Sequence, residues 1–149
     1  MIQGIVVKPL RRIPDDRGKI LHIMRNDEED FRKFGEVYCS TVFPGVIKAW
    51  HKHERMTLNY AVVKGMIKFV LFDDRRDSRT FGEIQEIYLG DDHYCRITVP
   101  PGIWNGFMGI GVKEAFVINV TDIPHDPKEI IRRDPFDPEI PFNWGIKHR

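Results

Sequence analysis

The sequence has few cysteines and no long apolar run. Cys39 and Cys95 are the only two cysteines among 149 residues, and no C-x-x-C spacing occurs. They therefore indicate neither a disulfide framework nor a structural zinc site, and a reducing cytoplasmic location is expected. No stretch is long enough for a membrane-spanning helix, and the first residues lack the apolar core and cleavage site of a secretory signal.

A surplus of one charge is also missing. The chain has 23 Lys and Arg residues against 22 Asp and Glu residues, which leaves a formal net charge of +1. Because the two signs are interspersed, they create no long-range field that would attract nucleic acid or an anionic membrane. We therefore expect a protein that binds neither.

Short runs rich in Val, Ile, Phe and Tyr recur between turn residues. Polar and apolar residues alternate within several of them, as strands with one buried face require. The pattern predicts an all-β domain, a sandwich or small barrel of antiparallel sheets, over residues 1–149. The runs lie at 4–7, 19–24, 36–43, 46–50, 57–63, 66–72, 83–89, 95–99 and 115–120.

The last segment, residues 121–149, differs in composition from the rest. It holds five of the ten prolines but also keeps Ile140, Phe142 and Trp144. A disordered tail would not be so apolar. We expect an extended C-terminal arm that packs on the barrel or on a second subunit.

Two histidines end one of the predicted strands. Residues two apart on a strand share a face, so Ala49, His51 and His53 should point one way, and Lys48 and Trp50 the other. Two imidazoles on one face could ligate a metal, or one of them could act as a base. A pair of partly exposed histidines at a strand end is the alternative.

The spacing of Gly45, His51, His53 and Gly65 resembles most of the first metal motif of cupin barrels. The other two ligand positions of that pattern hold Leu58 and Asn105. Leucine cannot ligate a metal, and asparagine is a poor ligand for a transition metal. We therefore expect no metal and no other cofactor, with a histidine acting as acid or base near neutral pH.

Several motifs in sequence order carry a more specific resemblance. Together they are similar to the dTDP-4-dehydrorhamnose 3,5-epimerase family, a metal-free cupin family. The resemblance implies a double-stranded β-helix (jelly-roll) barrel, homodimers that exchange strands or arms, and a nucleotide-diphosphate-linked 4-keto sugar as substrate. The motifs are Asp16-Arg17-Gly18, GVIKAWH at 45–51, the spacing of Gly65, Asp73 and Arg75, SRTFG at 78–82, PPGIWNGF at 100–107, IIRRDP at 130–135, and I-x-x-x-W ending at Trp144.

The resemblance places the family's catalytic base on His51 and the aspartate that orients it on Asp134. An imidazole beside a 4-keto sugar can remove the proton alpha to the carbonyl, and a carboxylate would fix its tautomer and stabilise the imidazolium. The alternative for Asp134 is a solvated turn residue before Pro135.

The resemblance also suggests substrate-binding residues. Lys48 replaces the family's arginine, keeping the positive charge for a diphosphate without the bidentate geometry. Arg17 is a second phosphate-binding candidate, and Arg75 a third, although a salt bridge with Asp73 would explain it equally well. Trp104 could stack on the nucleotide or the sugar, or pack in the core.

Three polar positions of the family are replaced in this chain. Leu58 stands for its lysine, Ile118 for its tyrosine acid and Asn105 for its histidine. The enolate oxygen thereby loses an electrostatic stabiliser. Asn105 could still donate a hydrogen bond to the carbonyl, and Tyr60, two residues beyond Leu58, could stand in as the acid.

The predicted function is that of an epimerase-like isomerase in the biosynthesis of cell-surface polysaccharide sugars, acting at C3, C5 or both carbons of a dTDP-4-keto-6-deoxy sugar. Two alternatives stay open. One is a dTDP-sugar 3,4-ketoisomerase in which His51 and His53 share the proton shuttling. The other is a non-catalytic cupin that binds a nucleotide sugar.

Overall fold

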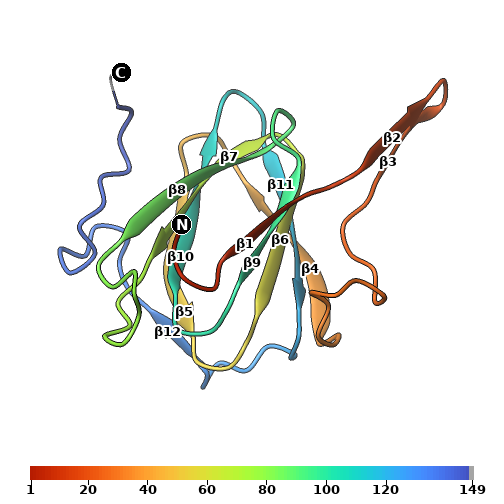
Figure 1. Ribbon diagram of the computed structural model, residues 1–149. Helices are drawn as coiled ribbons and strands as arrows, with labels where there is room; N and C mark the ends of the chain where they lie inside the picture. The colour runs from red at the N-terminus through yellow and green to blue at the C-terminus, as the bar shows by residue number, and fades with distance from the viewer. Residues whose placement is uncertain (148–149) are drawn as a thin grey trace.

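The computed structural model describes residues 1–147, which form twelve β-strands and no helix (Figure 1). Within these residues, therefore, no helix could cross a membrane. The strands are β1 (Val6–Pro9), β2 (Arg12–Asp15), β3 (Gly18–Leu21), β4 (Glu36–Val42), β5 (Ile47–His53), β6 (Leu58–Lys64), β7 (Met66–Phe72), β8 (Ile84–Gly90), β9 (Cys95–Val99), β10 (Trp104–Ile110), β11 (Ala115–Thr121) and β12 (Ile130–Arg132).

Two five-stranded sheets form a sandwich. Their strand orders are β1-β9-β6-β11-β4 and β12-β5-β10-β7-β8, and every pairing between these strands is antiparallel. The main core lies between them, where Phe69, Leu71 and Ile97 are fully buried. The predicted all-β class is thus confirmed, and its physical basis is the burial of the apolar face of each sheet.

Strand β7 departs from the prediction that each strand has one buried face and one solvent-exposed face. Lys68, on the face expected to be solvated, is only 5% exposed. Its ammonium group donates to the carbonyl oxygens of Trp144 and Gly145, at 3.5 and 3.4 Å. The outer face of this sheet is buried at Lys68 because the C-terminal segment covers it.

That covering is built from a second apolar cluster. Ile140 and Trp144 pack with Trp50, and the Trp50 and Trp144 ring centroids are 5.0 Å apart. Both indole N–H groups donate to the carbonyl oxygen of Pro135, at 3.2 and 3.1 Å. In the described residues, the C-terminal segment therefore packs on the barrel of its own chain. His148 and Arg149 of the predicted arm lie outside the described residues.

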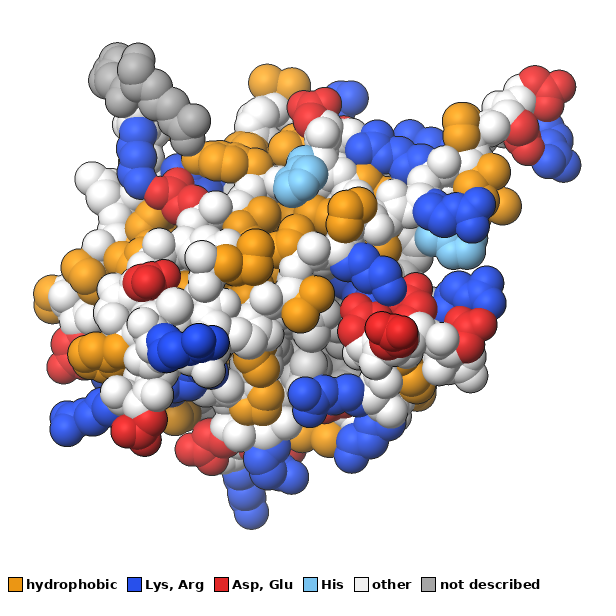
Figure 2. Space-filling view, in the orientation of Figure 1, with side chains coloured by type: hydrophobic (Ala, Val, Ile, Leu, Met, Phe, Trp, Pro, Cys, Tyr) orange, Lys and Arg blue, Asp and Glu red, His pale blue; other side chains and the backbone are white. Residues whose placement is uncertain are grey.

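The β2–β3 hairpin projects away from the barrel (Figure 1). Charged side chains gather at its tip and apolar ones lie along it (Figure 2). Ile20 on this hairpin is 60% exposed. An apolar side chain on a free-standing hairpin is left without a partner in its own chain.

Candidate active site

A one-residue bulge in β5 shapes the site. His51 pairs with Asn105 of β10, and Lys48 pairs with Phe107. The two β5 residues are three positions apart, whereas their β10 partners are only two positions apart. The extra residue reverses the alternation at this point. Lys48 was predicted to face away from His51, and this is wrong: both residues line the same pocket.

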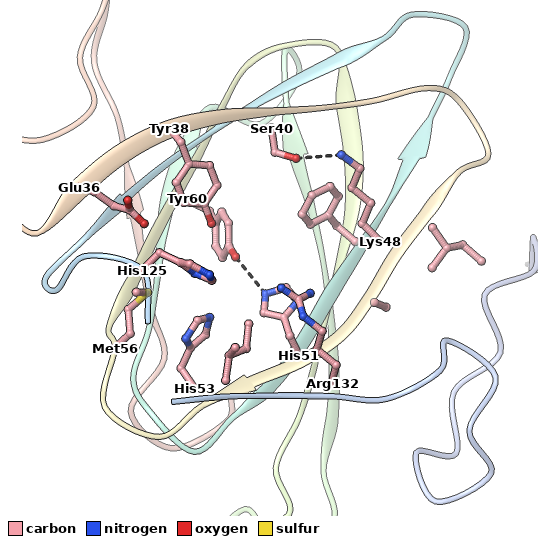
Figure 3. A pocket seen from close by; sticks show the side chains of 14 residues that line it. Glu36, Tyr38, Ser40, Lys48, His51, His53, Met56, Tyr60, His125 and Arg132 are labelled. Atoms are coloured by element: carbon pink, nitrogen blue, oxygen red, sulfur yellow. Dashed lines mark hydrogen bonds between the residues drawn. The ribbon is translucent and has the colours of Figure 1, made fainter. Parts of the chain in front are cut away.

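The pocket opens between the two sheets and has a volume of about 540 Å³. A cavity of this size suits a ligand larger than a few atoms. Figure 3 shows side chains from β4, β5, β6 and β12 converging on it. Its polar lining residues are Glu36, Tyr38, Ser40, Lys48, His51, His53, Tyr60, His125 and Arg132.

His51 and Tyr60 meet inside this pocket. The His51 Nε2 atom and the Tyr60 hydroxyl oxygen share a hydrogen bond of 3.2 Å (Figure 3). Tyr60 is 2% exposed, and its ring packs on Phe69 with centroids 5.2 Å apart. The phenol is thus held in place by the core while its hydroxyl reaches the pocket.

The protonation states of this pair follow from their surroundings. Burial lowers the pKa of His51 to about 3, and the nearby charges of His53 and Arg132 act in the same direction. Burial raises the pKa of Tyr60 well above its ordinary value. At neutral pH the imidazole is therefore neutral and able to accept a proton, while the phenol is protonated and able to donate one.

His53 has a different partner, the carboxylate of Glu129. The His53 Nδ1 atom is hydrogen-bonded to Glu129 Oε1, and the two residues are 6% and 2% exposed. Burial acts to raise the pKa of Glu129, but hydrogen bonds from His53 and the backbone outweigh it, so this pKa lies below its ordinary value. Glu129 is therefore ionised at neutral pH.

The opposite wall comes from β4, which contributes Glu36, Tyr38 and Ser40. Asn119 Nδ2 donates to the Tyr38 hydroxyl at 2.8 Å and so orients it. These residues were missing from the sequence prediction. Their spacing of two along a β-strand was the available signal, since it places all three on one face.

Two cations and a third histidine complete the pocket. Lys48 Nζ donates to Ser40 Oγ at 3.0 Å and to the carbonyl oxygen of Thr41 at 2.6 Å. Arg132 pairs with His51 across β12 and β5, which places its side chain beside that imidazole. His125 comes from the β11–β12 connection. These two cations outnumber the single lining carboxylate, that of Glu36, and this positive balance favours an anionic ligand.

The structure does not join Asp134 to His51. The Asp134 carboxylate is exposed and accepts the Phe136 N–H at 2.8 Å, a turn in which aspartate bonds the backbone two residues on. No hydrogen bond between Asp134 and His51 exists in residues 1–147. The carboxylate that bonds a pocket histidine is instead that of Glu129, which partners His53.

Three further predicted residues lie away from the pocket lining. Trp104 is buried, and its indole donates to Asp74 Oδ2 at 2.7 Å. Asn105 is buried behind β5 and donates to the His51 carbonyl oxygen at 3.2 Å. Arg75 forms the predicted salt bridge with Asp73, with Nε and Oδ1 2.8 Å apart.

Arg17 lies at the tip of the projecting hairpin, where its guanidinium pairs with Asp15 at 2.5 Å. The β2–β3 hairpin that carries it extends away from the barrel (Figure 1), and Arg17 is not among the residues that line the pocket. Ile118 stands at the position of the family's tyrosine. It pairs with Ala61 of β6 and Cys39 of β4, and each of these alternates along its strand with residues that face the pocket. Its side chain therefore points away from Tyr60.

Histidines dominate the pocket, but they do not converge on one point. In the described part of the chain, no group of three or more His, Cys, Asp or Glu side chains is arranged to hold a metal ion. His51 and His53 are each bonded to a different protein group. The geometry suits proton transfer and anion binding.

A double-stranded barrel with histidine, tyrosine and cationic side chains between its sheets defines a cupin with an acid–base pocket. The family profile described as dTDP-4-dehydrorhamnose 3,5-epimerase matches residues 1–149, and the chain belongs to this family. It is thus an epimerase-like member of the isomerase class. The predicted family and fold are confirmed.

Similar proteins come from bacteria and archaea. The chain is 36% identical over 151 residues to the spore coat polysaccharide biosynthesis protein SpsL of Bacillus subtilis, covering 100% of both chains. It is 33% identical to the probable low-salt glycan biosynthesis epimerase Agl13 of Haloferax volcanii, covering 95% of this chain and 89% of that one. The crystal structure of a dTDP sugar isomerase from Desulfovibrio desulfuricans G20 is 42% identical and superposes with a TM-score of 0.94, covering 96% and 92% of the two chains.

Proposed function

We propose that this protein removes a proton alpha to the keto group of a dTDP-4-keto-6-deoxy sugar during cell-surface polysaccharide biosynthesis. The observation that carries the proposal is the neutral His51 imidazole, 3.2 Å from the Tyr60 hydroxyl in a cationic pocket. Family membership supports the epimerase-like chemistry. His51 acts as the base, and the Tyr60 hydroxyl relays its proton.

The proton cycle passes through both residues. His51 takes the alpha hydrogen as a proton, and the electron pair of that C–H bond moves to the keto oxygen as an enolate. Tyr60 is hydrogen-bonded to His51 and so lies on the same side of the bound sugar. The other face of the carbon therefore takes its proton from solvent, which inverts the centre, and the imidazolium releases its proton to solvent through the Tyr60 hydroxyl. No net proton is gained or lost.

Cationic residues serve the diphosphate in this proposal. Lys48 and Arg132 line the pocket and supply the positive charge. We place Arg17 at the diphosphate of a second copy, because its hairpin extends away from its own barrel. A homodimer would also cover exposed apolar residues of the hairpin and of the edge strand β4, such as Ile20 and Val37, which are 60% and 54% exposed. The two free cysteines suit a cytoplasmic protein.

The test is solvent exchange. The protein is incubated with a dTDP-4-keto-6-deoxy sugar in deuterated water, and NMR locates the label at C3 and C5. Label at either carbon that disappears in H51N is expected. Binding of the sugar nucleotide without label would instead identify the non-catalytic alternative.

One observation favours the ketoisomerase as a second candidate. The His51 and His53 rings both face the pocket, with centroids 5.7 Å apart and planes at 85°. Two imidazoles on one wall could pass a proton between neighbouring carbons of one sugar ring. A C3-keto product in the same experiment would identify this reaction.

A further inference from the structure

We propose that Glu129 is a positioning residue that holds His53 as a second proton-transfer group of this pocket. The proposal rests on the proposed function, since it assigns a further residue to the same chemistry. His53 and Glu129 are 76 positions apart in the sequence and form a buried pair.

Both oxygens of Glu129 are occupied. Oε2 accepts the backbone N–H groups of Glu54, Arg55 and Met56, at 3.1, 3.0 and 3.2 Å. Within residues 1–147, Oε1 is hydrogen-bonded to His53 Nδ1 alone. Since an ionised carboxylate can only accept hydrogen bonds, Nδ1 must carry the proton. The neutral imidazole then has its lone pair on Nε2.

The Nε2 atom of His53 is available to a ligand. In residues 1–147 no hydrogen bond is made to it, and the His53 side chain lines the pocket near His125 and Met56 (Figure 3). The titratable and charged groups around it are His51, His125, Glu129 and Arg132. Only Glu129 among them bonds to the ring and can stabilise its protonated form.

His51 and His53 therefore differ as bases. In the described residues, the His51 side chain is bonded to a phenol and to no carboxylate. His53 has a buried carboxylate on Nδ1, the arrangement that fixes a histidine tautomer and stabilises the imidazolium formed when the other nitrogen takes a proton. With ring centroids 5.7 Å apart, the two imidazoles can serve different carbons of one sugar ring. We assign His53 to the second of these carbons.

Glu129 also has a structural role, because it ties the turn after β5 to the start of β12. The Glu54 N–H bonds the Glu129 carbonyl oxygen at 2.9 Å in addition to the side-chain bonds. A loss of activity alone would not separate positioning from folding. The experiment must therefore report on the histidine tautomer directly.

The variant Glu129→Gln is designed to reverse the tautomer. Its amide oxygen can keep the three backbone bonds, while its NH₂ group must donate to His53 Nδ1 and so leave the proton on Nε2. NMR of protein labelled with ¹⁵N-histidine should show an Nδ1–H tautomer for His53 in the unmodified protein and an Nε2–H tautomer in E129Q. An unchanged tautomer in E129Q, or Nε2–H in the unmodified protein, would overturn the proposal.

Solvent exchange resolved by carbon is the second readout. E129Q should lose about 100-fold in exchange rate at one carbon, the scale of acid–base catalysis, with dTDP binding unchanged. Glu54→Gln, on an exposed neighbour, is the matched control and should exchange normally. Equal exchange at both carbons in E129Q would refute the catalytic part.

A second variant covers a failure of E129Q to fold. His53→Asn keeps Glu129 and can still donate a hydrogen bond to Oε1, but it has no base. It should lose exchange at the same carbon, and normal exchange there would overturn the proposal. If the unmodified protein exchanges at neither carbon while the tautomers behave as expected, the proposed function fails and the positioning by Glu129 stands.

Discussion

Gly106 of β10 lies directly against Ala49 of β5: a Cβ atom added to Gly106 would stand 2.4 Å from the Ala49 Cβ. This contact occurs at the bulge that turns Lys48 towards His51. A glycine is required here because the bulged strand occupies the space of a side chain. The position of the site therefore depends on a residue that contributes no chemistry.

Gly106→Ala should destabilise the protein by about 1–3 kcal/mol, as overpacking does, and weaken dTDP binding because the bulge must shift. Urea unfolding and isothermal titration with dTDP measure the two effects. The double variant G106A/A49G removes the closest clashing atom and should recover part of the loss. Full stability in G106A alone would show that the contact is relieved without strain.

Tyr60→Phe keeps the ring packing on Phe69 and removes only the hydroxyl that meets His51. We expect solvent exchange to fall by about 100-fold or more, while the melting temperature changes little and dTDP binding is retained. The measurement is deuterium incorporation at saturating sugar nucleotide. Exchange at the unmodified rate would remove Tyr60 from the proton cycle.

Stability should depend on pH through His51. Its pKa is lowered to about 3, whereas in the unfolded chain it is near 6.5. As the pH falls through this window, the unfolded chain binds a proton that the folded protein does not. The free energy of unfolding therefore falls with pH, by at most about 1.4 kcal/mol per pH unit and less for a half-buried ring.

His51→Asn should flatten this slope between pH 6.5 and about 4. Urea unfolding at a series of pH values measures it. His22→Asn is the control, because the His22 side chain makes no hydrogen bond in residues 1–147 and should leave the slope unchanged. A slope that survives in H51N would assign the proton uptake to another group.

Trp144→Ala should lower stability by about 3–5 kcal/mol, because it opens a cavity against Trp50 and removes the bond to the Pro135 carbonyl oxygen. It should also uncover Lys68. Thermal unfolding provides the measurement. Phe136→Ala, at a side chain that is 74% exposed, is the control and should cost little. Equal losses in the two variants would show that the arm does not dock through Trp144.

Much of the fold could be predicted from local pattern. Alternation and turn residues located most strands, because the period of two is a property of the backbone that any strand shows. The prediction for β7 was wrong on its outer face, since local sequence does not say that Trp144 and its neighbours return to cover Lys68. Only the packing of segments distant in sequence decides which polar face of a strand stays exposed to solvent.

The site shows the same division. The sequence by itself determined that His51 and His53 share a face, because their spacing of two lies beyond the bulge. The tertiary structure alone decided that Lys48 joins them, through a register shift against β10, and that Glu129 rather than Asp134 supplies the buried carboxylate. Strand register and long-range pairing depend on which segments pack together in the folded chain. The local alternation of polar and apolar residues contains no information about those contacts.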